Sequence, residues 1–551
     1  MQPLDGYGTE RLSRKSTVFL EKTARSIVEI QPSLDSVPEI VVFLEVLGYN
    51  NKTANENGFS DLYQVAGRLH DILDRYVDGN RARLMQERSM AVPIPSVGRR
   101  FAQGLGLTFP WMGSLAVLYF FGVSLWLVWG LPLSIVTSLI VGVFFGLMLS
   151  EGPMQLFQRL VVFYYNQYNL SEVRRALKRS YYLSAALAAG ILGSVYLVSI
   201  LAHIPMQLAI LTMIAGSTIF AHRASYIVVY ALRKFTQIVI SYAAALFSLV
   251  ATFLFTYNII PLTLNRYLFS LGIAIIVLSV VPVYYTYRVF TGKSAYTLHD
   301  SKSNPLNTIV VNSKTIMSNF SVQLWEGLPY YLFGMLFFAM LFGDRILSWV
   351  YNPIRSANGI LLPMIFDPVY HLGADVALLV IFPAAVIQYA IMTPLAEQLW
   401  NLTTLTSISD AGKVDQFVRH RYQVLLLSSV LAAAAVACGL LVFGPAIESF
   451  LGGSLISLFV LRVAAVANVM ITIFMANSLL LIFLNKIRAL VGVALVGVAT
   501  LGVGGLILAR FGLEEIVLVY LFSAVETMAL STILIAIVLE KPASRFFSRY
   551  M

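Results

Sequence analysis

Long apolar segments alternate with polar connectors along the chain from Phe109 onward. Each segment holds roughly 20 or more mostly apolar residues, the length that an α-helix needs to cross a hydrocarbon core of about 30 Å. The pattern predicts membrane spans at 109–129, 132–166, 182–202, 206–232, 235–257, 267–288, 324–350, 371–400, 424–445, 453–485, 489–509 and 514–540. We therefore expect an all-α polytopic membrane protein with about 12 transmembrane helices.

Basic residues are concentrated in every second connector. The connectors after even-numbered spans contain Arg174, Arg175, Lys178, Arg179, Arg233, Lys234, Arg288, Lys293, Lys302, Lys314, Lys413, Arg419, Arg421, Lys486 and Arg488. The connectors after odd-numbered spans contain only Arg266, Arg355 and Arg510. Because cytoplasmic loops retain Lys and Arg, we expect a multi-pass protein of the cytoplasmic (inner) membrane with both termini in the cytoplasm.

The composition agrees with a membrane protein. Hydrophobic residues make up 58% of the chain and charged residues 12%, with a mean hydropathy of +0.77. Residues 1–108 hold 13 of the 38 basic and 13 of the 28 acidic residues, so the net charge of +10 belongs to the membrane part. This distribution favours contact with anionic membrane lipids over binding to nucleic acid. The single cysteine, Cys438, excludes an internal disulfide.

Residues 1–108 precede the first predicted span and are polar and mixed in charge, without a cleavable signal peptide. Apolar residues in Ile40–Leu47 and at helical spacing in Ser60–Val77 predict helices, and the Asn-rich stretch Asn50–Gly58 predicts a loop between them. We expect a small helical N-terminal cytoplasmic segment. A docking or structural role and a regulatory, ligand-binding role both remain open for it.

The polar connector 289–323 divides the predicted spans into six and six. The expected domains are the N-terminal segment, a first six-helix membrane bundle over 109–288, this cytoplasmic connector, and a second six-helix bundle over 324–551 that ends in a short cytoplasmic tail. Two bundles joined on one side are a common transporter plan, with the pathway between them.

Motifs of catalysis and of energy coupling are absent from the sequence. Gly292-Lys293-Ser294 resembles the end of a phosphate-binding loop, but Tyr287 stands where that motif requires glycine. The six histidines show no paired spacing of the kind that holds zinc, and no nucleophile has an adjacent base. We therefore predict no catalytic residues, no metal and no cofactor, and expect a protein that moves a substrate.

Ionisable residues inside a span are costly unless they face a bundle interior, water or a partner, so they are candidates for function. Glu151, Gln155 and Arg159 recur at i, i+4 and i+8, which places them on one face of the second span. Pro153 removes a backbone donor within the same helix. This face is expected to line a polar cavity; a structural salt bridge or an interfacial helix end is the alternative.

Asp344 and Arg345 form an adjacent pair of opposite charge in the seventh span. Neighbours on a helix point about 100° apart, so we expect each to contact other helices as well as its neighbour. Snorkelling of Arg345 to the interface is the alternative. His222-Arg223 is expected to contact lipid headgroups. Weaker candidates for the pathway, each near a predicted helix end, are Arg462, Glu326, Glu397 and Glu526.

Three segments within the spans carry a family resemblance. Gly152–Leu156 reads Gly-Pro-Met-Gln-Leu and is followed by Arg159. Phe342–Trp349 reads aromatic-x-Asp-Arg-x-x-x-Trp, and Tyr370–Pro383 begins Tyr-His-Leu and ends Ile-Phe-Pro. These segments resemble elements of the Pel exopolysaccharide transporters, which belong to the multidrug/oligosaccharidyl-lipid/polysaccharide (MOP) flippase superfamily.

The chain departs from the Pel pattern at several positions. Arg345 replaces a Lys, and His371 stands where the family has Asp, which adds His371 to the pathway candidates. Ile391 and Thr393-Pro394 replace the Arg and the Glu-Thr that follow the third segment in the family. The resemblance covers roughly 109–551 and leaves the N-terminal segment outside.

The resemblance implies a flippase that exports a polysaccharide by alternating access. Its implied partners are a sugar polymer or lipid-linked sugar, membrane lipids and a polysaccharide synthase complex. A lipid-linked oligosaccharide flippase and a multidrug exporter are alternatives within the same class. A membrane-embedded sugar polymerase would favour a large outer loop with clustered charges, whereas the connector 351–370 carries only Arg355 and Asp367. A membrane scaffold or sensor would need no polar groups facing a cavity.

Overall fold

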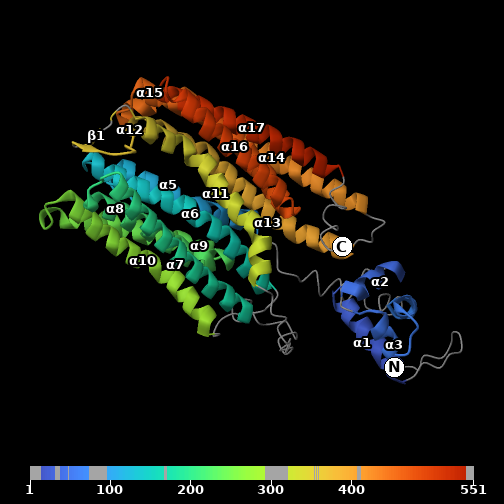
Figure 1. The fold of residues 1–551 in the computed structure, drawn as a ribbon. Coiled ribbons are helices and arrows are strands. Elements are labelled where there is room, and N and C mark those ends of the chain that lie inside the picture. Colours follow the sequence, from blue (N-terminus) through green and yellow to red (C-terminus); the bar gives the residue numbers. More distant parts are fainter. Residues whose placement is uncertain are drawn as a thin grey trace. The chain divides into compact units, whose positions relative to one another are not determined.

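The structure is a computed structural model that describes residues 14–30, 37–46, 49–73, 96–166, 170–291, 320–352, 354, 356–357, 359–405 and 411–540 (Figure 1). The chain divides into two compact units. The larger is made of Val97–Met392 and Tyr422–Val538, and the smaller of Met1–Ser96, Thr393–Arg421 and Leu539–Met551. The predicted connector 289–323 lies mostly outside the described residues, as does Gly292-Lys293-Ser294.

Twelve helices in the described part of the chain are long and apolar enough to cross a membrane, as predicted. The first six are α5 (Val97–Phe121), α6 (Leu133–Asn166), α7 (Leu170–Leu201), α8 (Met206–Ala231), α9 (Phe235–Phe255, continued by the 3-10 turn η1, Thr256–Asn258) and α10 (Thr263–Thr291). The second six are α11 (Phe320–Tyr351), one span made of α12 (Pro368–Ala377), η3 (Leu378–Val380) and α13 (Ile381–Leu405), then α14 (Ala411–Leu451), α15 (Leu455–Phe483), α16 (Ile487–Leu508) and α17 (Leu513–Leu539). The strands β1 (Ser356–Ala357) and β2 (Ile360–Leu361) form a small antiparallel hairpin between α11 and α12.

Helices α5, α7 and α14 (Ala411 and not 424) each begin more than ten residues earlier than hydropathy predicts. Helix α5 begins at Val97 and not at 109, and the polar residue Arg100 in its first turn donates a hydrogen bond from its guanidinium to the carbonyl oxygen of Ala390 at 3.0 Å. Helix α7 begins at Leu170 and not at 182, and its first turn holds the ion pair of Glu172 with Arg175. Polar first turns escape a hydropathy scan, although they continue the same helix.

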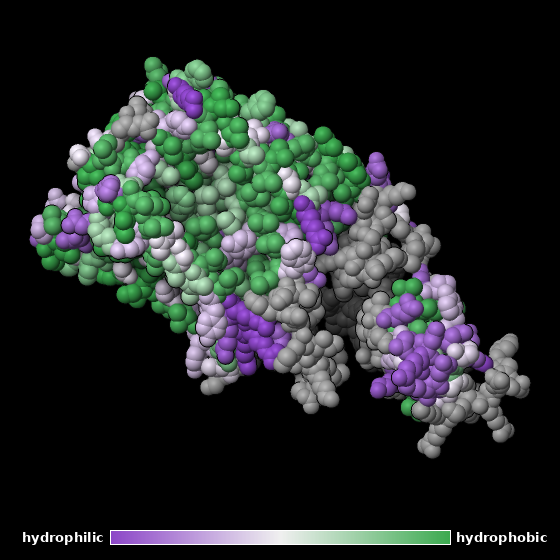
Figure 2. Space-filling model, in the orientation of Figure 1, coloured by the Kyte–Doolittle hydropathy of each residue, from purple (hydrophilic) through white to green (hydrophobic). Residues whose placement is uncertain are grey.

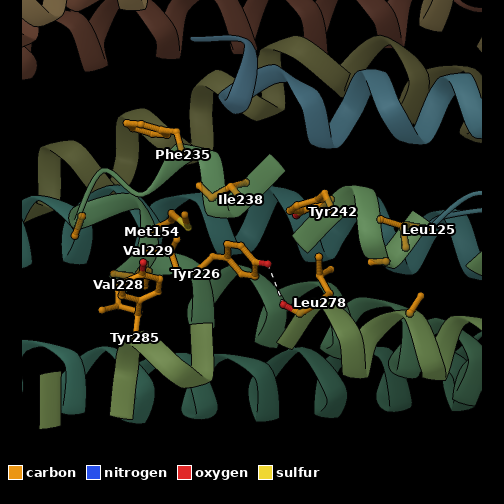
Figure 3. Packing of buried hydrophobic residues seen from close by; sticks show 14 of the residues in the cluster. Leu125, Met154, Tyr226, Val228, Val229, Phe235, Ile238, Tyr242, Leu278 and Tyr285 are labelled. Atoms are coloured by element: carbon orange, nitrogen blue, oxygen red, sulfur yellow. Dashed lines mark hydrogen bonds between the residues drawn. The ribbon is translucent and has the colours of Figure 1, made fainter. Parts of the chain in front are cut away.

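The spans form two six-helix bundles, blue to green and yellow to red in Figure 1. In the first bundle, α6 packs against α7 and α8, and α9 against α5 and α10. Tyr226 of α8 is buried in this core and donates a hydrogen bond to the carbonyl oxygen of Leu278 on α10 at 2.9 Å (Figure 3). In the second bundle, α11 packs against α16, and α12 against α15. Helices α6 and α11 join the two bundles.

Hydrophobic residues cover most of the visible face of the spans (Figure 2). Large apolar side chains such as Phe247 and Phe522 are exposed on the spans, which is the kind of surface that lipid requires.

The chain leaves α6, α8, α10, α13 and α15 at the same end of the bundles, which we call the basic end. There, burial together with the nearby charges of Arg99 and Arg288 lowers the pKa of Lys234.

The N-terminal helices have a hydrophobic core of their own. Helices α1 (Arg14–Ile30), α2 (Val37–Val46) and α3 (Asn51–Glu56) and a helix over 62–73 bury apolar residues such as Leu20, Ile40, Leu44 and Leu69.

The prediction of a loop over Asn50–Gly58 is wrong, because α3 forms within it. The Asn50 side chain caps α3 by accepting the backbone N–H of Thr53 at 2.9 Å. Asn is a strong cap residue as well as a loop former, so composition alone did not separate the two. At the next helix, the Asp61 side chain accepts the backbone N–H of Gln64 at 2.8 Å.

Candidate functional site

The adjacent residues Asp344 and Arg345 of α11 lie at the centre of a buried polar network. The Arg345 guanidinium donates to Asp344 Oδ1 at 3.1 Å and, through Nε, to Asp375 Oδ1 at 2.9 Å. The Tyr370 hydroxyl donates to Asp344 Oδ2 at 3.0 Å. The pair therefore contacts α12 as well as itself. Its burial also excludes the alternative in which Arg345 snorkels to an interface.

His371 extends this network toward Trp349. The Trp349 indole N–H donates to His371 Nε2 at 2.9 Å, and His371 Nδ1 lies 3.3 Å from Asp375 Oδ2. An indole is only a donor, so Nε2 must be unprotonated and Nδ1 must carry the hydrogen that faces Asp375. His371 is therefore neutral in this arrangement. We call Asp344, Arg345, Trp349, Tyr370, His371 and Asp375 the Asp344 network.

The Asp344 network has an excess of negative charge. It contains two carboxylates, one guanidinium and a neutral imidazole. The side chain of Asp344 has 0% of its surface exposed and that of Arg345 2%, whereas the side chain of Asp375 is 28% exposed. Asp375 is thus the carboxylate of the network that is not fully buried.

Helix α12 holds three members of the network in place. Asp367 caps it by accepting the backbone N–H groups of Val369 and Tyr370, and Pro368 stands in its first turn, where no backbone donor is needed. His371 and Asp375 are one turn apart and share a face. Gly373 allows close packing on α15, because a Cβ there would collide with the Ser457 backbone. Asp367, predicted as an outer-loop charge, is explained by this cap.

A second buried ion pair lies in the first bundle. Glu151 of α6 pairs with Arg223 of α8, and the Gln155 side chain donates to Glu151 Oε1 at 2.7 Å. The Arg223 guanidinium also lies over the Phe338 ring of α11, 5.5 Å from its centroid. We call Glu151 and Arg223 the Glu151 pair.

The expectation that His222-Arg223 contacts lipid headgroups is wrong. Arg223 is taken up by the Glu151 pair, and His222 Nε2 lies 2.6 Å from the Tyr242 hydroxyl on α9. The side chains of His222 and Arg223 thus point into the bundle, where Tyr242 and Glu151 are their polar partners.

The face of α6 that carries Glu151, Gln155 and Arg159 adjoins α11. The Arg159 guanidinium lies over the Tyr330 ring at 3.7 Å. Gly334 of α11 permits this approach, because a Cβ there would lie 2.9 Å from Gln155 Cγ and 3.1 Å from the Glu151 carbonyl oxygen.

The same two helices meet again further along. Phe144 of α6 makes edge-on contacts with the rings of Phe342, Trp349 and His371, with centroids 5.1 to 5.6 Å apart. The segments Gly152–Leu156 and Phe342–Trp349 therefore lie on two helices that touch each other, and one wall of the Asp344 network is provided by the first bundle.

Three of the weaker candidates lie outside both clusters. Arg462 and Glu326 are exposed, and Glu526 accepts a hydrogen bond from Thr500 at 2.5 Å. The side chain of Glu397 lies outside the described residues. The sequence prediction missed Asp375, whose signal was an acidic residue one turn after His371 in an apolar span.

Solved structures share this fold. No protein-family model matches the chain, and no curated protein matches it. A structure of MATE in the straight conformation is 11% identical with a TM-score of 0.55, covering 81% of this chain and 95% of that one. MATE in the bent conformation is 14% identical with a TM-score of 0.52, covering 82% and 100%.

A third structure, described as the outward-facing conformation of a multidrug resistance MATE family transporter of the MOP superfamily, is 14% identical with a TM-score of 0.51. The match covers 80% of this chain and 96% of that one. The chain therefore has the fold of MATE transporters. Identities this low establish the fold and leave the cargo to be argued from the site.

Proposed function

We propose that this protein is a membrane transporter of the flippase type that exports a polysaccharide, similar to the Pel exopolysaccharide, by alternating access. One observation carries the proposal. The segments that resemble Pel transporters lie on α6 and α11, the two helices that join the bundles, and they bring buried charge to that contact. The MATE fold supports the transport class.

In this proposal the two bundles rock against each other, and the pathway runs between them. Asp344 changes its partner or its protonation during the cycle, and Arg345 neutralises it in the state described here. Asp375 is the group that meets the pathway, since it is the exposed carboxylate of the Asp344 network. Aromatic and polar side chains contact the cargo weakly at many points, because a polymer must keep sliding.

The charge variants Asp344→Asn, Arg345→Gln and the double variant test this function. The readouts are secreted polymer and the amount of protein in the membrane. Reduced export per molecule of membrane protein in the single variants supports a role in the pathway. Wild-type export per molecule in the singles, with a loss of protein that the double variant rescues, would assign the pair a purely structural role, and normal export in all three would remove it from the site.

A multidrug exporter is the second candidate, favoured by the fold shared with a multidrug resistance transporter. Cells that lack the protein distinguish the two functions. We expect them to lose secreted polysaccharide and to keep their resistance to cationic dyes such as ethidium. The opposite result would assign the protein to drug export. Unchanged polymer secretion together with accumulation of a lipid-linked sugar would favour an oligosaccharide flippase.

We further propose that the basic end faces the cytoplasm of the inner membrane, where a polysaccharide synthase complex would deliver the polymer. Ser303→Cys, made in a Cys438→Ala background, tests this orientation. A membrane-impermeant maleimide should label Cys at this position only after the cells are permeabilised. Labelling in intact cells would reverse the orientation and would contradict export in the proposed direction.

A further inference from the structure

Arg266 is a buried cation without a counter-ion among the described residues, and it lies in a part of the molecule that the transport proposal does not use. It stands in the first turn of α10, and only 7% of its surface is exposed. Its guanidinium lies between two rings, 4.3 Å from the centroid of Phe253 and 4.7 Å from that of Tyr257. Arg266 Nε has no hydrogen-bond partner in the described part of the chain.

The sequence around Arg266 offers no carboxylate. No Asp or Glu occurs between Glu172 and Asp300, a stretch that contains nearly all of α7 and all of α8, α9 and α10. The acidic side chains of the first bundle, Glu151 and Glu172, are paired with Arg223 and Arg175. An anion that neutralises Arg266 must therefore come from outside these helices.

The position of Arg266 in the helix raises the free-energy cost of burying its charge without an anion. The N-terminus of a helix carries a partial positive charge, so a cation in the first turn of α10 is repelled by the helix to which it belongs. The faces of Phe253 and Tyr257 attract the guanidinium, but they do not neutralise it. The same helix end binds an anion well, because its first backbone N–H groups point outward.

The surface around this site is apolar. Leu254, Phe255, Ile259, Leu262 and Phe269 are all at least half exposed and surround the junction of α9 and α10. Tyr257 is exposed there as well, as expected of an aromatic residue at the boundary between membrane and water. A ligand at Arg266 would therefore place its anionic group on the guanidinium and hydrocarbon against these side chains.

We propose that Arg266, between Phe253 and Tyr257, binds the phosphate of a membrane lipid at the end of the bundles opposite the basic end. The phosphate oxygens accept hydrogen bonds from the guanidinium and face the N-terminus of α10. The acyl chains pack on the apolar residues at the junction of α9 and α10. Phosphate is the chemistry that the site recognises, and the apolar surround selects a lipid over a free ion.

Thermal unfolding of the delipidated, detergent-purified protein tests the site. The added probes are dioctanoyl-phosphatidylglycerol, dioctanoylglycerol without a phosphate, and inorganic phosphate. The phospholipid should raise the Tm in a saturable manner, because a ligand that binds the folded state stabilises it. The other two probes should not. Equal stabilisation by dioctanoylglycerol would leave only apolar contact and overturn the proposal, and equal stabilisation by inorganic phosphate would contradict the lipid assignment.

Variants place the effect at Arg266. Arg266→Gln should weaken the apparent affinity for the phospholipid about tenfold or more, the loss expected for a charge-assisted hydrogen bond. Arg510→Gln is the matched control, since Arg510 is an exposed arginine in a connector at the same end. It should leave the affinity unchanged.

Phe253→Leu keeps the charge of Arg266 and should weaken the affinity for the phospholipid less than Arg266→Gln does. It is the second test variant if Arg266→Gln does not fold. If both Arg266→Gln and Phe253→Leu bind the phospholipid with wild-type affinity, the proposal is overturned. If Arg266→Gln cannot be purified, wild-type affinity of Phe253→Leu alone overturns it.

Discussion

The Asp344 network and the Glu151 pair are both buried ion clusters inside the membrane part, yet they are built differently. The Glu151 pair is neutral: one carboxylate meets one guanidinium, and Gln155 and Phe338 complete the surroundings. The Asp344 network has two carboxylates and one guanidinium. In addition, Tyr370 donates a hydrogen bond to Asp344, and the Trp349 indole donates one to His371. Its extra carboxylate, Asp375, is the exposed one.

This difference separates two uses of buried charge. A pair of one carboxylate and one guanidinium balances its own charge and fixes the contact of α6 with α8. A network with an exposed excess carboxylate is incomplete in one state, and it can gain a proton or a polar group when the pathway opens to it. Within the proposed function, we therefore expect the moving part of the cycle in the second bundle and a structural role for the Glu151 pair.

The largest effect is expected for Arg345→Gln. The change leaves Asp344 without a cation in a site with no exposed surface, and the free energy of unfolding should fall by about 3–5 kcal/mol. Protein level in the membrane and Tm in detergent measure the loss. The double variant Asp344→Asn, Arg345→Gln should recover part of it, because it removes the uncompensated charge. An Arg345→Gln variant as stable as wild type would show that buried Asp344 does not need this guanidinium as its counter-ion.

A smaller loss is expected for Glu151→Gln. Arg223 then loses its counter-ion, but its side chain is 19% exposed and still lies over Phe338, so we expect a loss of about 2 kcal/mol. Export per molecule in the membrane should stay near the wild-type value. Strongly reduced export at normal Tm would contradict the structural role of the Glu151 pair and would place it in the pathway.

The smallest effect is expected for Trp349→Phe, which removes the indole donor and keeps an aromatic ring. Losing one hydrogen bond to His371 should cost about 1 kcal/mol. Export should change more than stability, because His371 Nε2 is then free to take a proton. Trp111→Phe, a change in the stacked ring on Phe342, is a control that leaves His371 untouched. Equal loss of export in both variants would assign the effect to packing.

Hydropathy predicted the twelve spans and the division into two bundles, since a membrane imposes length and apolarity on every crossing helix. The site was less predictable. Asp344 and Arg345 could be identified as an adjacent pair in a span, but their partner Asp375 lies on another helix, and no spacing rule connects the two. Arg223 was predicted to contact lipid headgroups because its partner Glu151 also lies on another helix. Partners across helices depend on helix rotation, which a hydropathy pattern leaves open.

The central claim is that the exposed carboxylate of the Asp344 network acts in transport, and Asp375→Asn tests it most directly. The variant keeps the neutral pair of Asp344 with Arg345, so the protein should fold and reach the membrane at a near-normal level. The measurement is secreted polymer per molecule of protein in the membrane. We predict a loss of about tenfold or more, the effect of roughly 1.4 kcal/mol on the rate-limiting step. Wild-type export by Asp375→Asn at normal protein level would contradict the account.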